Sequence, residues 1–484
     1  MKFSFINPSS SAEGPLLVNA AWPPLGILYC VEYLRREGIE TSVLDQAAKG
    51  YSRQQALNWI RKENPDILGF SMLIGSARET LNIAREAKAH NPDMKIVLAN
   101  YHATFNAERI LKKYSFVDFV VRGEGEHTGL ELAKCLKKNG DLKKVEGITF
   151  RDKKGKVVST TDRPLIKNVD EIPFPDRKLL DVEYSSIIFG LKVATKRFTT
   201  MVSSRGCPFQ CSFCGCRKFA RGVWRPRSVE NIMQELELLY SEGYRQFLFV
   251  DDNFALNTRR VEKLCEQIKK AKLDIEWFCD SRVDNSRLEV FKRMTNAGCR
   301  LLYFGIESGT QRILDYFKKG TTPGQSKKAV EKARKAGIDV IVGSFVIGTP
   351  DENRKEIQQT LEFALELDID VPQLNILAAF PGTDVWSEMV AKGYINEDEY
   401  WETGIYVPLV SPQATPFEEI RAMIYNYFKV FYLRPKVLMA EALRTATSPY
   451  RLAGVFENLI HVNTIMDEIR QGVKDNSQLF LKKE

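Results

Sequence analysis

Apolar and polar residues alternate along the first 150 residues in a pattern typical of parallel α/β folds. Amphipathic stretches with helical spacing, such as Leu25–Arg36, Ser52–Glu63 and Ala77–Ala89, separate short apolar runs. These runs, the expected strands, are KFSFIN (2–7), ETSVLD (40–45), DILGFSM (66–72), KIVLAN (95–100) and VDFVVRG (117–123). The pattern predicts a doubly wound parallel sheet over residues 1–150, with a ligand crevice at the carboxyl ends of its strands.

The alternation stops in residues 151–196. The stretch RDKKGKVVSTT predicts a hairpin around Lys154 and Gly155, and DEIPFPDR contains too much proline for a helix or a central strand. We interpret residues 151–196 as a connector that runs over the surface.

A second series of strands and helices begins at Arg197. Its expected strands are RFTTMVSS (197–204), FLFVDD (247–252), IEWFCDS (275–281), LLYFGIES (301–308), DVIVGSFVIG (339–348) and QLNILAAF (373–380). Six such units predict a partial (β/α)6 barrel of the TIM type over residues 197–395, with chemistry at the carboxyl ends of the strands. After Trp401 the strand signal ends, so residues 396–484 are expected to be helical. The amphipathic, basic stretch 416–444 is also compatible with contact with a membrane surface.

Composition narrows the class of protein. The chain has 484 residues, of which 44% are hydrophobic and 27% charged, as in ordinary globular proteins. The first residues do not resemble a signal peptide, and no apolar run approaches the roughly 20 residues of a membrane span. Nine cysteines, an odd number, argue against a disulfide scaffold, and we expect a cytoplasmic protein. The net charge of +8 is spread over scattered lysines, so no nucleic-acid partner is expected.

Four of the nine cysteines lie together in SSRGCPFQCSFCGC (203–216). A zinc site usually needs four ligands, commonly as two separated pairs, and no second CxxC or HxxxH follows. An iron–sulfur cluster of four irons normally takes four thiolates, so three thiolates leave one iron open to a small molecule. The spacing Cys207-x3-Cys211-x2-Cys214 therefore favours an open four-iron cluster, and we interpret Cys216 as a bystander thiol.

The CxxxCxxC motif after the first strand of such a barrel resembles that of the radical S-adenosylmethionine (SAM) enzymes. Arg205, Gly206 and Pro208 also fit that family, and the resemblance covers most of residues 197–392. It implies a 4Fe-4S cluster on Cys207, Cys211 and Cys214, whose open iron binds SAM for reductive cleavage to a 5′-deoxyadenosyl radical. It also implies SAM contacts at Phe213, Asp251, Asp252, Asn253, Glu307, Ser308, Gly343, Ile347 and Gly348. Asp251, Asp252 and Asn253 replace the Gly-Gly-Glu often found in the family. The alternative explanation for Asn253 is that it caps the N-terminus of the following helix.

The first 150 residues have a resemblance of their own. PPLGILYCVEYLRREG, NPDILGFSM, YHATF and VDFVVRGEGE are similar to the cobalamin-binding domain that precedes the barrel in one large radical SAM group. That group includes the anaerobic magnesium-protoporphyrin monomethyl ester cyclase and its hopanoid- and lipid-modifying relatives. The resemblance implies cobalamin contacts at Asn7, Asp45, Ser71, Asn100, His102, Gly123, Glu124, Gly125 and Glu126. Two departures are that Asp45 is not followed by the cobalt-ligating histidine of other cobalamin proteins, and that Ala99-Asn100 replaces the usual Gly-Gly.

Together these features predict a cobalamin-dependent radical SAM enzyme that modifies an unactivated carbon of an apolar small molecule. C-methylation and oxidative cyclisation both remain open, and an electron donor such as flavodoxin or ferredoxin is implied. No catalytic residue is assigned, although Tyr303 and Asp280 lie at strand ends. One alternative is a tRNA-modifying enzyme of the methylthiotransferase kind, which would carry three extra N-terminal cysteines where this chain has Cys30 and Cys135. The other is a non-enzymatic cobalamin or iron–sulfur sensor, which would need an output module.

Overall fold

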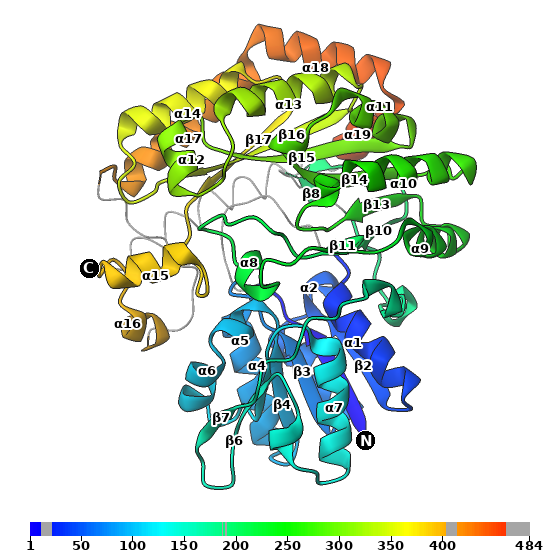
Figure 1. Cartoon of the computed structure of the whole chain (residues 1–484), viewed down its shortest axis with the longest axis vertical. Helices are drawn as coiled ribbons and strands as arrows, with labels where there is room; N and C mark the ends of the chain where they lie inside the picture. Colours follow the sequence, from blue (N-terminus) through cyan, green and yellow to red (C-terminus); the bar gives the residue numbers. More distant parts are fainter. Residues whose placement is uncertain (11–21, 186, 189–190, 403–413, 461–484) are drawn as a thin grey trace.

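The computed structural model describes residues 1–10, 22–185, 187–188, 191–402 and 414–460. Two α/β units lie one above the other, with the N-terminal sheet in the lower half of Figure 1 and the second sheet in the upper half. The mixed α/β fold class expected from the sequence is confirmed.

The first sheet contains all five expected strands in the order β2-β1-β3-β4-β5-β6-β7. The strands are β1 (Lys2–Asn7), β2 (Glu40–Asp45), β3 (Ile67–Ser71), β4 (Lys95–Ala99), β5 (Phe119–Val121), β6 (Ile148–Arg151) and β7 (Val157–Ser159). The first five pair in parallel, whereas β6 and β7 are antiparallel. The hairpin predicted around Lys154 and Gly155 is therefore present, but it extends the first sheet instead of starting a surface connector.

Helices cover both faces of this sheet, as the doubly wound pattern predicts. They are α1 (Leu25–Arg36), α2 (Gln46–Lys49), α3 (Arg53–Glu63), α4 (Ala77–His90), α5 (Tyr101–Phe105), α6 (Ala107–Lys113) and α7 (Gly125–Lys137). One face buries α1 and α7 against Phe3, Phe5 and Phe119, and the other buries α3, α4 and α6. The connector that follows contains β8 (Ile187–Ile188) and β9 (Leu191–Lys192), which pair antiparallel.

The second sheet has six parallel strands in sequence order, as expected for a partial barrel. The strands are β10 (Phe198–Met201), β13 (Gln246–Phe249), β14 (Glu276–Arg282), β15 (Cys299–Glu307), β16 (Val340–Ile347) and β17 (Val371–Ile376). Its outer face packs against α9 (Val229–Ser241), α10 (Thr258–Lys270), α11 (Leu288–Asn296), α13 (Pro323–Lys335) and α14 (Arg354–Glu366). Its inner face carries one apolar side chain from each strand: Phe198, Leu248, Phe278, Leu301, Val342 and Val371. This apolar layer closes the interior near the amino ends of the strands, so the carboxyl ends form the open side.

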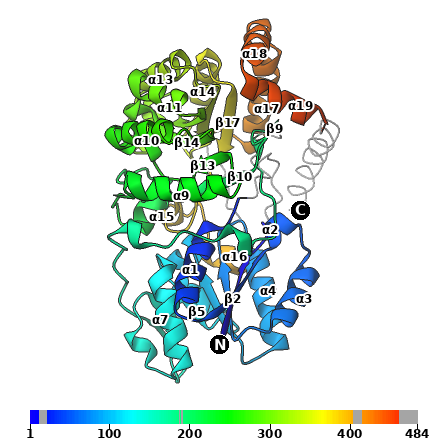
Figure 2. The ribbon, with the colours of Figure 1, turned by 90° about the vertical axis from the view of Figure 1, so that its right-hand side faces the viewer.

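Short elements lie between the two sheets. They are β11 (Ser204–Arg205), α8 (Cys216–Phe219), β12 (Arg225–Pro226), α12 (Gln311–Tyr316), α15 (Asp384–Ala391) and α16 (Glu397–Glu402). Side chains of α15 and α16, including Trp386 and Trp401, share one apolar core with Ala103 and Ala107 of the first unit. Figures 1 and 2 agree in placing α15 and α16 at the junction.

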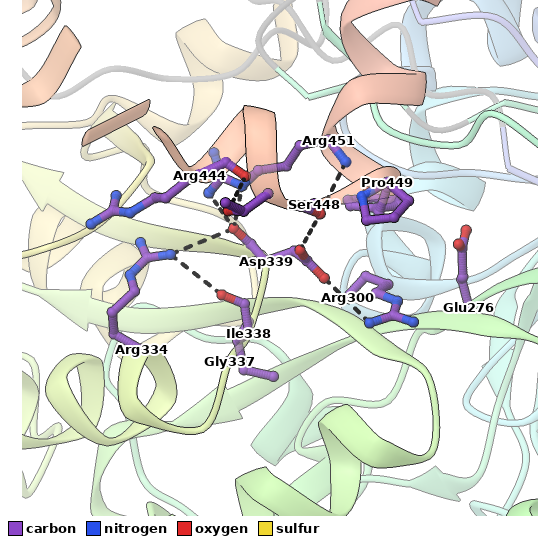
Figure 3. A pocket seen from close by; sticks show the side chains of 12 residues that line it. Glu276, Arg300, Arg334, Gly337, Ile338, Asp339, Arg444, Ser448, Pro449 and Arg451 are labelled. Carbon is purple, nitrogen blue, oxygen red and sulfur yellow. Dashed lines mark hydrogen bonds and ion pairs between the residues drawn. The ribbon is translucent and has the colours of Figure 1, made fainter. Parts of the chain in front are cut away.

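Three C-terminal helices end the described chain: α17 (Phe417–Leu433), α18 (Pro435–Thr447) and α19 (Pro449–Ile460). Helix α17 buries Ile420, Tyr427 and Phe431 in the core of the barrel. Helices α18 and α19 are fastened to the amino ends of the strands by ion pairs from Arg444 and Arg451. A cavity of about 400 Å³ lies there, lined by arginines that are paired with acids (Figure 3). None of the described helices is long and apolar enough to cross a membrane.

Candidate functional site

The cysteine loop follows β10, and its entry is fixed by Asp251. The buried Asp251 carboxylate accepts hydrogen bonds from Ser203 N (2.7 Å) and from Ser203 Oγ (2.6 Å). Gly206 has a φ of +83°, and a Cβ there would lie 2.2 Å from the carbonyl oxygen of Val223. Only glycine fits this position. The loop thus turns sharply just before its first cysteine, and Asp251 acts as its anchor.

The three predicted ligands lie in one loop after β10, at the carboxyl ends of the strands. Cys207, Cys211 and Cys214 are half-buried, and burial together with the neighbouring Cys211 raises the pKa of Cys214 to about 11. The Sγ of Cys211 accepts a hydrogen bond from Arg282 Nη1 (3.7 Å). A four-iron cluster places each ligand on a different iron, so the sulfurs need not converge on one point. This thiol set fits such a cluster.

Within the described ranges, no group of three or more His, Cys, Asp or Glu side chains, the three cysteines included, is arranged to hold a single metal ion. The preference for a cluster over zinc therefore rests on the CxxxCxxC spacing. Cys216 is buried at the start of α8, where burial and the nearby Asp252 raise the pKa of its thiol well above the usual value. This environment agrees with the interpretation of Cys216 as a bystander.

Several residues expected to contact SAM come together at the same edge. Asp252 is exposed there and accepts a hydrogen bond from Gly206 N (3.0 Å). Asn253 is 1% exposed, yet neither atom of its amide has a hydrogen-bond partner. Glu307, which ends β15 with a φ of +69°, accepts from Lys319 Nζ (2.6 Å). Buried amide atoms without partners are rare, so a polar ligand such as SAM fits this edge.

Other expected SAM contacts are oriented away from the open side. Ser308 Oγ lies 3.0 Å from Thr360 Oγ1 on α14. A Cβ on Gly343 would lie 3.1 Å from Ile306 and Ile369, and Ile347 is buried in the outer core. These residues can reach a ligand only through their backbone. Gly348 N donates to Glu352 Oε2 (2.7 Å), and Phe213 packs edge-on against Phe317.

The carboxyl edge of the first sheet carries most of the residues predicted to contact cobalamin. Asn7 Nδ2 donates to Asp45 Oδ1 (3.0 Å), and Asn100 Nδ2 donates to Ser71 Oγ (2.9 Å). Asn100 has a φ of +84° and also accepts from Tyr101 N, so its side chain lies back on the sheet. A Cβ on Gly123 would meet nothing within 4 Å. Asp45, which we expected to contact cobalamin, is instead buried and accepts from Tyr184 Oη (2.8 Å) as well, so its carboxylate is taken up by protein. The partly exposed Ser71, Asn100 and Gly123 fit a large ligand such as cobalamin.

Three further residues of that predicted cobalamin set are placed differently. His102 is 3% exposed, and its ring lies against Trp401 with centroids 5.9 Å apart. Burial lowers the pKa of His102 to about 3, so the imidazole is neutral. We expected His102 near the corrin, but α5 directs its side chain into the shared core. Glu124 and Glu126 are bound by arginines.

These arginines form a set of contacts that sequence reasoning missed, here called the interdomain clamp (Glu124, Glu126, Arg205 and Arg225). Arg205 Nη2 donates to Glu126 Oε1 (2.6 Å) and Arg205 Nη1 to Glu124 Oε1 (3.2 Å). Arg225 Nη2 also donates to Glu124 Oε1 (2.9 Å). Burial acts to raise the pKa of Glu124, but Arg225 and Arg205 more than offset this and leave that pKa below its usual value. The clamp joins the loop after β5 directly to the cysteine loop.

Asp280 and Tyr303 face the interior of the barrel above its apolar layer. They are register partners on the neighbouring strands β14 and β15. Asp280 is exposed to this interior, and no hydrogen bond or ion pair of its side chain is found in the described structure. Desolvation by the surrounding protein, together with Asp251 and Asp252, raises the pKa of Asp280 to about 7. Its carboxyl can therefore hold or release a proton near neutral pH.

Comparison with known proteins agrees with this geometry. Residues 201–364 match the model of the radical SAM superfamily, and residues 17–133 match that of the B12 binding domain. The chain is 36% identical to an uncharacterized methyltransferase of Pyrococcus horikoshii, over 91% of this chain and 94% of the relative. It is 29% identical to the anaerobic magnesium-protoporphyrin IX monomethyl ester cyclase of Rubrivivax gelatinosus, over 90% and 78% of the two chains. The fold is similar to that of the radical SAM methyltransferase TsrM from Kitasatospora setae, solved with cobalamin and a [4Fe-4S] cluster (TM-score 0.66, 17% identity, 81% and 78% covered).

Proposed function

Because the chain belongs to the cobalamin-binding radical SAM family, we propose that it methylates an unactivated carbon of an apolar small molecule. Membership makes the protein an enzyme of the methyltransferase or cyclase type that uses a 4Fe-4S cluster, SAM and cobalamin. The named relatives are methyltransferases and cyclases, so they favour neither a tRNA-modifying enzyme nor a sensor.

One observation carries the choice of methyl transfer: the two edges expected to hold the cofactors are in direct contact. Arg205 in the cysteine loop reaches Glu126 at the edge of the first sheet (2.6 Å). The ring of Tyr101, which begins α5 at the same edge, lies 3.5 Å from where a Cβ on Gly215 would be. When bound, the cluster and SAM supply a 5′-deoxyadenosyl radical and cobalamin supplies a methyl group. A substrate between the two edges can therefore meet both.

The chain's own residues have distinct parts in this proposal. Cys207, Cys211 and Cys214 hold the cluster, while Asp252, Asn253 and Glu307 bind SAM. The apolar layer, with Phe278 and Leu301 among its members, closes the barrel interior and excludes water from an apolar substrate. Asp280 holds or accepts a proton at its carboxyl oxygens close to Tyr303.

The electron needed for SAM cleavage comes from a small donor protein such as flavodoxin or ferredoxin in this proposal. The half-buried thiols of the cysteine loop support it, because a cluster held there lies close to the surface.

The C-terminal helices support a peripheral contact with an anionic membrane surface. Leu433, Met439 and Leu443 are 71%, 69% and 68% exposed. Residues 417–460 contain six Lys or Arg and four Asp or Glu. Exposed apolar side chains among basic ones are typical of helices that lie in a bilayer interface. Flotation with anionic vesicles tests this: the protein should float, a Leu433→Asp/Met439→Asp variant should not, and wild type that stays at the bottom contradicts it.

A labelling experiment tests methyl transfer. The enzyme is reconstituted anaerobically with iron, sulfide and hydroxocobalamin, then reduced with SAM deuterated at its methyl group. Tetrapyrrole esters, hopanoids and isoprenoid lipids serve as substrates, because the chain is similar to the tetrapyrrole cyclase named above and, at 26% identity over 93% of its length, to the hopanoid C-3 methylase of Methylococcus capsulatus. A product carrying the labelled methyl group is expected, and the Cys214→Ala variant should form none. An unlabelled product that has lost hydrogen would show oxidative cyclisation and contradict the proposal.

A further inference from the structure

Arg282, the last residue of β14, reaches from the barrel into the cysteine loop. Its side chain is 8% exposed, and the guanidinium carbon lies 3.6 Å from the centroid of the Phe209 ring. Phe209 stands between Cys207 and Cys211 in the sequence. Nη1 donates to Cys211 Sγ (3.7 Å), and Nη2 donates to the carbonyl oxygen of Lys319 (2.7 Å). The guanidinium is therefore fixed on several sides, with one N–H directed at a cluster ligand.

Asp284, two residues further on, holds the same guanidinium with both carboxylate oxygens. Arg282 Nε donates to Oδ1 (3.1 Å) and Nη2 to Oδ2 (2.9 Å). An arginine is charged at every accessible pH, so a positive charge lies beside Cys211, and Asp284 offsets part of it.

A charge at this place has a direct consequence for an iron–sulfur cluster. Hydrogen bonds to the sulfurs and the net charge near them set the reduction potential, because both stabilise the added electron of the reduced state. Stacking on Phe209 alone would give Arg282 only a packing role. The N–H on Cys211 and the chelating Asp284 are what distinguish a tuning residue from a packing residue.

We propose that Arg282 is a positioning residue that raises the reduction potential of the cluster through Cys211, and that Asp284 limits this effect. The proposal rests on the cluster assigned under the proposed function. Arg282 also links the cluster to the SAM edge through Lys319. The carbonyl oxygen of Lys319 accepts from Arg282, and its Nζ donates to Glu307 Oε1 (2.6 Å).

A redox titration followed by electron paramagnetic resonance tests the proposal on the anaerobically reconstituted enzyme. Arg282→Gln removes the positive charge, so its cluster should be harder to reduce. Asp284→Asn leaves that charge uncompensated while keeping a hydrogen-bond acceptor, so its cluster should be easier to reduce. The ratio of reduced to oxidised cluster at a fixed potential should change about tenfold in opposite directions, equivalent to about 59 mV each way. Arg282→Lys should fall between wild type and Arg282→Gln.

The matched controls are Arg293→Gln and Glu262→Gln, a partly exposed ion pair on the helices outside the sheet (3.7 Å). Neither should move the potential. Potentials that stay unchanged, or move in the same direction, in Arg282→Gln and Asp284→Asn with normal iron and sulfide content would overturn the proposal. If Arg282→Gln fails to assemble a cluster, an unshifted Asp284→Asn still overturns it. Failure of the cluster assignment looks different, because wild type would then show no four-iron signal at all, and failure of methyl transfer alone would leave both shifts in potential in place.

Discussion

At the scale of single residues, four neighbouring thiols have different surroundings. Cys207, Cys211 and Cys214 are half-buried on the loop, and Arg282 donates to Cys211. Cys216 instead lies buried near Asp252. Since a thiolate ligand needs an accessible sulfur, we propose the first three as ligands of one iron each.

Replacing these cysteines one at a time should therefore divide them into two groups. Cys207→Ala, Cys211→Ala and Cys214→Ala should each abolish the four-iron signal and SAM cleavage. Cys216→Ala should retain both, because its partners are protein groups. Mössbauer spectra of the anaerobically reconstituted variants provide the measurement, and loss of the cluster in Cys216→Ala would contradict the three-ligand assignment.

Substitutions of Asp251 and Asn253, which follow β13, should have different effects on the cluster and on SAM binding. Asn253 has a buried amide without partners, so Asn253→Ala should keep the cluster and weaken SAM binding about 10- to 150-fold, the value of a charged hydrogen bond. Asp251 anchors Ser203 at the entry to the cysteine loop, so Asp251→Ala should lose the cluster itself. Calorimetric titration with SAM, beside iron analysis, checks both. Unchanged SAM affinity in Asn253→Ala would refute its role.

Residue spacing identified the cysteines but not the groups that surround them. A local motif is visible because its members lie within eight positions, from Cys207 to Cys214. Arg282 and Cys211 are 71 positions apart, and Arg205 and Glu126 are 79 apart, so only the fold brings them together. The same holds for His102, whose direction is set by the packing of α5 against Trp401. Side-chain direction depends on tertiary contacts that a single sequence does not display.

At the scale of elements, apolar patterning located the eleven expected strands because buried parallel strands are short apolar runs. It did not show that β6 and β7 join the first sheet, since pairing depends on which edge is free. The turn after β16 is another feature set by packing. Buried Glu352 accepts from Gly348 N and Thr349 N (3.0 Å) there, while its Oε1 has no hydrogen-bond partner.

Glu352 should make stability depend on pH. Burial raises its pKa to about 7 in the folded protein, against an ordinary value near 4.3 when unfolded. The stability from its neutral form is fully present below the unfolded pKa and is lost as pH rises through about 7. Between about pH 5.5 and 7.5 wild type should lose on the order of 2 kcal/mol of unfolding free energy that Glu352→Gln does not lose. Urea titrations at several pH values measure this, with the exposed Glu362→Gln as control; parallel curves for wild type and Glu352→Gln would contradict it.

At the scale of the whole molecule, two kinds of contact hold the cofactor edges together. One is the apolar core shared by α5, α15 and α16, three helices that Figure 1 places near the junction of the two units. The other is the interdomain clamp, whose Arg205 and Glu126 side chains are 15% and 4% exposed. Apolar burial stabilises the contact but does not depend on direction. The hydrogen-bonded ion pairs of the clamp do, so they fix the orientation of the cysteine loop relative to the first sheet. A two-cofactor reaction depends on that alignment, because a misplacement of about 1 Å can cost roughly 100-fold in rate.

Replacing the carboxylates of the clamp by amides should therefore disturb the alignment of the two units while each unit keeps its cofactor. In a Glu124→Gln/Glu126→Gln variant, Arg205 and Arg225 lose their carboxylate partners, and breaking a buried pair costs about 3–5 kcal/mol. Cobalamin uptake and the four-iron signal should persist, because neither set of proposed ligands is changed. 5′-Deoxyadenosine should still form, but methylated product per deoxyadenosine should fall at least tenfold, and calorimetric unfolding should separate into two transitions. Glu131→Gln, which removes a more exposed partner of Arg163, should change neither the product ratio nor the single transition. A clamp variant that loses deoxyadenosine formation and product in equal proportion would show that these residues support SAM cleavage and not the alignment of the two edges.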